Sequence, residues 1–125
     1  MEALQVSQTV MDEYSARILL GTFDRSVSAL ELSQRFGIPI AACYRRIRGL
    51  EGMGLVFVER ELPSRNGKGL QLFRSRLRSV RVSLEEGRLR ARVLLDARGP
   101  AGSAETVAAE QVLNLEDRPA RPQPL

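Results

Sequence analysis

The chain has no histidine and no tryptophan, and its 125 residues include a single cysteine, Cys43. These absences exclude a disulfide framework and weigh against structural zinc and against a histidine as general acid or base. A metal sensor that binds through paired thiols is excluded as well. We interpret Cys43 as a small buried apolar residue, with a redox-sensing thiol as the alternative. We therefore expect neither a bound metal nor a cofactor.

Long apolar runs are also missing, and no stretch approaches the roughly 20 residues that a membrane-spanning helix needs. The first residues include acidic side chains and lack the positive segment of a signal peptide. The sequence holds neither a glycine-rich phosphate loop nor a nucleophile beside a base, so an enzyme is not expected. The length indicates one domain that can bury its own core, and we expect it to be soluble and cytoplasmic.

Positive charge is concentrated in the middle of the chain. Residues 35–92 hold fourteen Lys or Arg against five Glu, a net charge of +9, whereas residues 1–34 carry −3 and residues 93–125 carry −2. A basic block of this kind indicates a polyanion as partner. The alternative is a solvated face. The ratio of eighteen Arg to one Lys also fits a GC-rich genome.

Three helices are expected before the first strand. Apolar side chains at helical spacing predict the first helix over 11–20. The second is predicted over 28–36, because Ser28 with Glu31 three residues later forms a capping box. Gly37 then supplies the tight turn that joins two helices in a helix-turn-helix unit.

The third helix is predicted over 39–51, with proline at its first position. Residues at spacings of four and three form its buried stripe, namely Cys43, Ile47 and Leu50. The residues beside this stripe make a face with small side chains at the start of the helix and basic side chains further along. Arg46 is expected to point toward the helix over 28–36 or toward the backbone.

Strands are predicted over 55–62 and 70–73, on either side of the turn-rich loop "PSRNGKG" with its basic tip. A further hairpin follows, in which 80–84 and 89–93 alternate apolar with polar residues. Its connection is predicted to have three residues, Glu85–Gly87, with glycine at a positive φ. One face of this hairpin should be apolar and the other should carry arginines.

Residues 1–95 are expected to form the domain, and residues 96–125 a flexible tail rich in proline and alanine. Apolar residues at helical spacing predict a short helix over 104–115 within this tail. The proline-rich segment after it is expected to be disordered.

The order of these elements is that of a winged helix-turn-helix domain, so we expect an α+β fold with an additional C-terminal β-hairpin. The stretch from Ser28 to Val56 resembles the DNA-binding core of the ArsR/MarR-like winged-helix regulators. The matching segments are Gly37-Ile38-Pro39 at the turn and Leu50-Glu51-Gly52-Met53-Gly54-Leu55-Val56 before the wing. The later hairpin, "VRVSLEEGRLRARV", resembles small archaeal helix-turn-helix proteins. The family's paired-cysteine metal-sensing motif is absent, so the resemblance implies no metal effector.

The resemblance implies that the helix over 39–51 enters the major groove while the wing over 63–69 meets flanking DNA. The residues expected to contact DNA are Ala41, Ala42, Tyr44, Arg45, Arg48, Arg65, Asn66 and Lys68. The two alanines would allow close approach, and Arg45 would read a guanine through O6 and N7. Tyr44 and Arg48 would contact phosphate or base, and the last three residues lie at the wing tip.

The function expected is a homodimeric, sequence-specific DNA-binding regulator of transcription. The alternative is a winged-helix protein–protein interaction module whose basic face meets an acidic partner. RNA binding ranks third, because the chain has few aromatic residues for base stacking. Packing remains an alternative for Tyr44, and a solvated role for the arginines of the helix.

The later hairpin has alternatives of its own. We favour a solvated face for Arg88, Arg90 and Arg92, and its edge is alternatively a surface that pairs with a second copy. The sequence does not distinguish an activator from a repressor, and it does not indicate the target DNA or an effector ligand.

Overall fold

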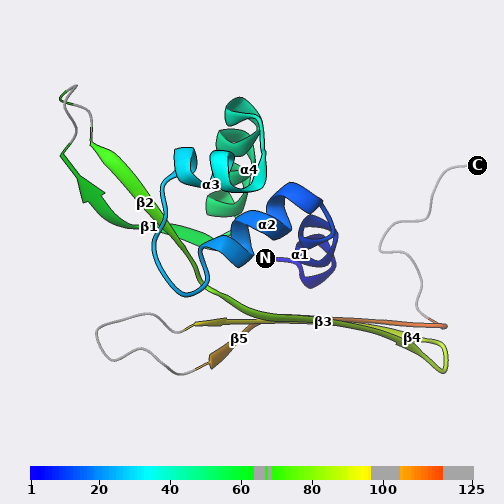
Figure 1. Cartoon of the computed structure of the whole chain (residues 1–125). Coiled ribbons are helices and arrows are strands. Elements are labelled where there is room, and N and C mark those ends of the chain that lie inside the picture. Colours follow the sequence, from blue (N-terminus) through cyan, green and yellow to red (C-terminus); the bar gives the residue numbers. More distant parts are fainter. Residues whose placement is uncertain (64–66, 68, 97–104, 117–125) are drawn as a thin grey trace, which may run out of the picture.

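The computed structural model describes residues 1–63, 67, 69–96 and 105–116. Within these residues the chain is an α+β fold with four helices and two antiparallel sheets. This agrees with the α+β class that the sequence predicts. The elements in chain order are α1 (Ala3–Val10), α2 (Glu13–Gly21), α3 (Ala29–Phe36), α4 (Ile40–Gly52), β1 (Val56–Leu62), β2 (Leu70–Ser75), β3 (Leu77–Glu85), β4 (Arg88–Asp96) and β5 (Glu105–Asn114). Figure 1 shows the helices on one face of the larger sheet, with the β1–β2 hairpin extending to the side.

The N-terminal region holds two helices where we expected one over 11–20. α2 corresponds to the expected helix, and α1 precedes it. The Asp12 side chain caps α2 by accepting a hydrogen bond from the Ser15 amide at 3.0 Å, so the chain turns between the helices. The prediction missed α1 because it is only eight residues long and its two buried residues, Ala3 and Val6, make a short pattern.

The α3–α4 turn forms as predicted. Ser28 caps α3, with its side chain accepting from the Glu31 amide at 3.1 Å, and Gly37 ends the helix at φ +66°. That left-handed conformation favours glycine because it has no Cβ. Pro39 lies one residue before α4, not at its first position.

The smaller sheet pairs β1 with β2 in antiparallel register, with Val56 opposite Ser75 and Leu62 opposite Leu70. Val27, just before α3, joins this sheet through two backbone hydrogen bonds with Phe73, of 2.9 and 2.8 Å. The hairpin is therefore fixed to the start of α3 as well as to the end of α4.

The larger sheet has the strand order β3-β4-β5 and is antiparallel throughout. The predicted hairpin is confirmed, although its connection is shorter than expected. Glu85 pairs with Arg88, and the two residues between them, Glu86 and Gly87, have φ values of +49° and +76°. Two consecutive positive φ values are typical of a type I′ turn, which matches the twist of the flanking strands.

The predicted helix over 104–115 is wrong, because residues 105–114 form β5 along the open edge of β4. Ala109, Gln111 and Leu113 lie opposite Val93, Ala91 and Leu89. Short apolar runs fit helix and strand equally well, and here the unpaired backbone groups of β4 favour the strand. Residues 97–104 and 117–125, which include most of the expected linker and tail, lie outside the described residues.

The core lies between the helices and the two sheets. Its largest fully buried side chains include Ile18 of α2, Leu32 of α3, and Ile47 and Leu50 of α4. α1 covers β4, where Ala91 and Val93 are fully buried, and the Leu4 amide donates to the Gln111 side chain at 3.1 Å. The apolar face of the larger sheet is thus joined to the helices, and its opposite face is left outside.

Candidate nucleic-acid interface

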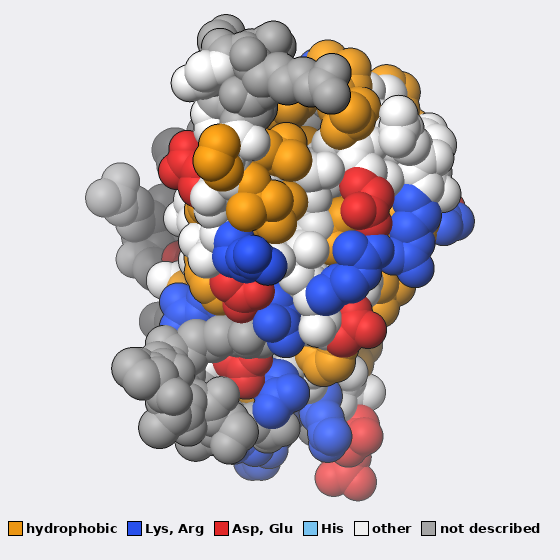
Figure 2. All heavy atoms as spheres, turned by 60° about the vertical axis from the view of Figure 1, so that its left-hand side comes forward, with side chains coloured by type: hydrophobic (Ala, Val, Ile, Leu, Met, Phe, Trp, Pro, Cys, Tyr) orange, Lys and Arg blue, Asp and Glu red, His pale blue; other side chains and the backbone are white. Residues whose placement is uncertain are grey.

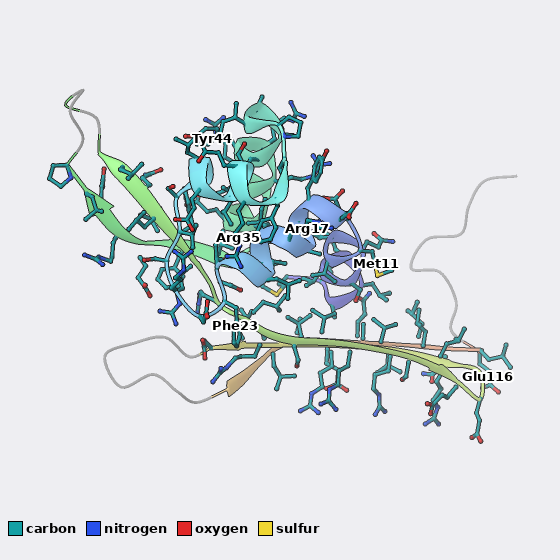
Figure 3. All side chains as sticks on the ribbon, viewed as in Figure 1. Met11, Arg17, Phe23, Arg35, Tyr44 and Glu116 are labelled. Atoms are coloured by element: carbon teal, nitrogen blue, oxygen red, sulfur yellow. The ribbon has the colours of Figure 1, made fainter. Side chains whose placement is uncertain are left out.

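α4 is held by a buried stripe and presents the opposite side to solvent. Cys43, Ile47 and Leu50 are at most 1% exposed, as their spacing predicts. Ala41, Tyr44, Arg45 and Arg48 are exposed together on the other side. We call these four residues the α4 face. Figure 3 shows the labelled Tyr44 at the end of the molecule farthest from the larger sheet.

Ala42 does not belong to the α4 face, and its predicted contact with DNA is wrong. Its side chain is only 7% exposed and packs in the core. It precedes Cys43 by one residue and Arg46 by four, which places it on the side of the helix that contacts the rest of the protein. Ala41 alone therefore supplies the small residue at the start of the exposed face.

Arg45 and Arg48 form no ion pair with any described residue. Several other arginines on this side of the chain are engaged: Arg17 of α2 pairs with Glu13, Arg25 before α3 with Glu31, and Arg74 of β2 with Glu59. An exposed guanidinium without a carboxylate partner has all its N–H donors available to a ligand. Arg35 of α3 and Arg60 of β1 are likewise exposed without an ion pair to a described residue, so the α4 face differs in bringing two such arginines together, one turn apart.

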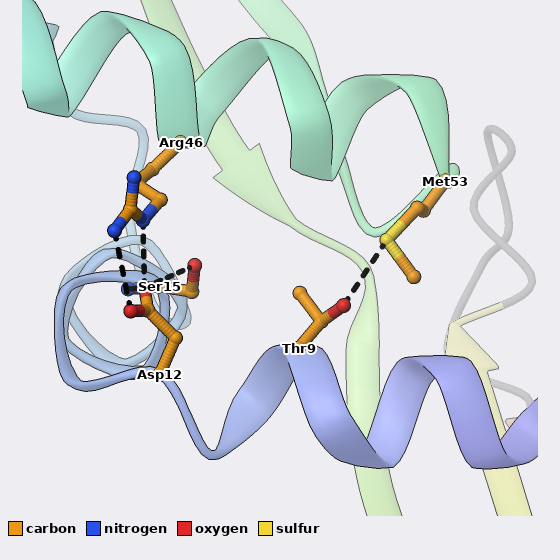
Figure 4. Close-up of polar contacts among 5 residues, drawn as sticks. All are labelled: Thr9, Asp12, Ser15, Arg46 and Met53. Carbon is orange, nitrogen blue, oxygen red and sulfur yellow. Dashed lines mark hydrogen bonds and ion pairs between the residues drawn. The ribbon is translucent and has the colours of Figure 1, made fainter.

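Arg46 has a structural role, and its partner is not the one we expected. It extends from α4 to the cap of α2, where its Nε and Nη2 donate to the two carboxylate oxygens of Asp12 at 2.8 and 3.3 Å (Figure 4). A second contact, from the Thr9 hydroxyl to the Met53 sulfur at 3.5 Å, joins the far end of α4 to α1. Together they fix the direction of α4 relative to the N-terminal helices.

The Arg46 side chain, followed by the Ser15 amide, lowers the pKa of Asp12 from its ordinary 3.8 to about 2. A carboxylate that accepts charged and backbone hydrogen bonds is stabilised in its ionised form. The ionised group therefore stabilises the folded state at and above the ordinary value, and this contribution is lost as the pH falls toward 2.

Replacing Asp12 with asparagine is expected to lower the free energy of unfolding by about 1 kcal/mol at neutral pH. Asparagine still caps the helix but cannot pair with Arg46, and the 38% exposure of the carboxylate keeps the loss small. In urea titrations the difference in unfolding free energy between wild type and D12N should shrink as the pH falls from 3.8 toward about 2. A difference that stays constant with pH would show that the ionised carboxylate is not its source.

The residues predicted at the tip of the β1–β2 hairpin, Arg65, Asn66 and Lys68, lie outside the described residues. The described stem holds an exposed cation that our sequence interpretation missed. Arg60 of β1 is exposed and forms no ion pair with a described residue. Its place in a predicted strand next to a basic loop was the available signal.

Figure 2 shows the side of the molecule that faces left in Figure 1. Basic and acidic side chains are interspersed on it, and they do not form one continuous basic strip. The ion pairs Arg25–Glu31 and Arg74–Glu59 illustrate this mixing. The net positive charge of the middle segment is therefore partly neutralised in place.

Cys43 is fully buried, and its thiol donates to the Ala29 carbonyl oxygen at 3.5 Å. Burial raises the pKa of this thiol, which disfavours the reactive thiolate. The interpretation as a buried apolar residue is confirmed for its position, and the thiol helps to join α4 to α3.

None of the helices in the described part of the chain is long and apolar enough to cross a membrane. The same residues contain no group of three or more cysteine and acidic side chains placed to hold a metal ion. Comparisons of the chain with protein-family models and with curated proteins find no match.

Proposed function

We propose that this chain is a winged helix-turn-helix protein that binds specific duplex DNA and regulates transcription, as a homodimer in the cytoplasm. α4 would enter the major groove, and the β1–β2 hairpin would act as the wing on flanking DNA. The order α2, α3, tight turn, α4, β1, β2 supports this proposal, as does the backbone pairing of Val27 with Phe73.

The observation that carries the proposal is the α4 face itself. Arg45 and Arg48 lie one turn apart, both exposed and both without a described carboxylate partner. A guanidinium on an exposed helix reaches two acceptors of guanine at once, and the nearby Tyr44 hydroxyl can donate to phosphate. Ala41, at the start of the helix, removes bulk where the backbone would come closest to the base edges.

The experiment that tests the proposal is titration of the full chain against random-sequence duplex DNA at several salt concentrations, followed by selection of bound sequences. We expect affinity to fall steeply with salt and a palindrome to be enriched, with half-sites about one helical turn apart. Binding without an enriched sequence would overturn specific readout. No binding at low salt would overturn DNA as the ligand.

The alternative, a protein–protein interaction module, is supported by two observations. The surface in Figure 2 mixes both signs of charge, which suits a protein partner better than a polyanion. An apolar groove also runs between α2 and β3, lined in part by Leu19, Phe23 and Leu77. Leu20 beside it is 73% exposed, which is unusual for a large apolar side chain.

A further inference from the structure

The larger sheet has an outer face that the helices do not cover. Alternation along the strands puts Ala91 and Val93 against α1 and their neighbours on the opposite side. Four arginines lie on that side, Arg81 of β3 and Arg88, Arg90 and Arg92 of β4, all exposed. We call these four residues the outer face. Figure 3 shows nitrogen-tipped side chains extending from the sheet away from the helices.

Like charges oppose each other on this face. Arg81 and Arg92 are direct cross-strand partners, and neither forms an ion pair with a described residue. Cations directly opposite in an antiparallel pair destabilise a sheet. Carboxylates lie at the edges of the group: Glu85 is the cross-strand partner of Arg88, and Glu110 is the partner of Arg92, with a long contact of 3.9 Å to Arg90. They offset part of the positive charge, but none of them forms an ion pair with Arg81 or Arg92. An anion bound between Arg81 and Arg92 would relieve this repulsion.

The spacing of these arginines selects the kind of anion. Arg88, Arg90 and Arg92 occupy alternate positions of one strand, so their Cα atoms are separated by about 6.8 Å. A duplex carries its phosphates at regular intervals along each strand, so an evenly spaced row of cations suits a phosphate backbone better than a single small anion. Two small residues, Ser79 and Ser83, lie on the same face of β3 as Arg81. Their small side chains would let a phosphate backbone approach the sheet.

The chemistry of this face favours a phosphate backbone over bases or lipid. No aromatic residue lies on β3, β4 or β5, so there is no platform for base stacking. Membrane surfaces are bound with an apolar face beside the cations. The exposed apolar residues of β3, Val82 and Leu84, instead share a face with Ala91 and Leu89, opposite the four arginines.

We propose that the outer face is a second nucleic-acid site, which binds the phosphate backbone of duplex DNA without sequence preference. It lies on the side of the molecule opposite α4 (Figure 1), so one chain presents two DNA-binding surfaces that face in different directions. The outer-face site does not depend on α4, and it would allow the protein to hold two DNA segments together.

The test uses the full chain with Arg45 and Arg48 replaced by alanine, so that duplex binding through α4 is removed. Two charge-matched variants are made in this background. The first carries R81Q and R92Q on the outer face, and the second carries R17Q and R25Q, which remove two exposed, ion-paired arginines of the helical side. Binding of a short random duplex is measured over a range of salt concentrations.

We expect the R45A/R48A background to keep salt-dependent duplex binding. The R81Q/R92Q variant should bind at least about tenfold more weakly, with a salt slope lower by about two, because two phosphate contacts are lost. The R17Q/R25Q variant should match the background. The thermal midpoint of R81Q/R92Q should not fall, since the substitutions remove a repulsion, and this excludes misfolding as the cause.

Contrary results separate the two proposals. Absence of duplex binding in the R45A/R48A background would overturn the outer-face site and leave α4 as the DNA-binding surface. Equal losses in the two charge-matched variants would also overturn it, as would equally effective competition by polyglutamate. If R45A/R48A binds every DNA as wild type does and R81Q/R92Q removes that binding, the outer face stands and the proposed role of α4 fails.

Discussion

Replacing Arg45 with alanine is expected to weaken binding to the selected DNA sequence by about 5- to 150-fold, while binding to random duplex changes far less. This range corresponds to the 1–3 kcal/mol that a bidentate contact to one base pair typically contributes. Arg45 has the exposure and the free guanidinium that such a contact needs. Selection with the variant should show relaxed preference at one position of each half-site.

The matched control for this prediction is Arg17→Ala. Arg17 lies on α2, is also exposed, and is held by Glu13 at 3.0 Å, so its loss changes the net charge equally without touching the α4 face. We expect R17A to bind both DNAs nearly as wild type does. If R45A lost the same affinity for selected and random duplexes, Arg45 would be a phosphate contact, and base readout would lie elsewhere.

Replacing Gly21 with valine is expected to lower the free energy of unfolding by about 1–3 kcal/mol through overpacking. A Cβ at this position would lie 2.7 Å from Cε2 of Phe36 and 2.9 Å from Cδ2 of Leu32. Leu32 is fully buried and cannot move aside without disturbing the core. The added side chain should therefore push α3, and with it the turn into α4, away from α2.

Gly49→Val provides the comparison, because Gly49 lies within α4 and a Cβ there meets no atom within 4 Å. Its substitution should change the unfolding free energy by less than about 0.5 kcal/mol, or raise it slightly through better helix propensity. Urea titrations of both variants measure the contrast. A loss at Gly21 no larger than that at Gly49 would mean that α2 and α3 adjust freely, contrary to the close approach described.

Gly21 also illustrates what a sequence pattern can and cannot reveal. The sequence indicates a helix end there, and α2 does end at Gly21. The requirement for glycine, however, comes from a side chain fifteen residues later, Phe36, which approaches only when α3 packs on α2. No local pattern contains that distance.

Residues close in sequence determined much of the α4 face. The capping of α3 by Ser28, the positive φ of Gly37 and the helical spacing of Cys43, Ile47 and Leu50 are set by short-range hydrogen bonds and periodicity. They explain why the turn and the exposed positions of Tyr44, Arg45 and Arg48 were predicted correctly. The strongly alternating hairpin was predicted for the same reason.

Contacts between distant segments decided the rest. Arg46 differs in role from Arg45 and Arg48 because it pairs with Asp12, which lies 34 residues earlier in the chain. Residues 105–114 form the strand β5 because the edge of β4 was open for backbone pairing. Ala42 was buried by packing, although it follows the exposed Ala41 directly. The sequence by itself determined which segments near α4 form helices and hairpins, because these elements depend on interactions between residues close together in the chain. Only the tertiary structure decided which arginines form ion pairs and which face of the larger sheet is left uncovered by helices. Both depend on residues that folding brings together from distant parts of the chain.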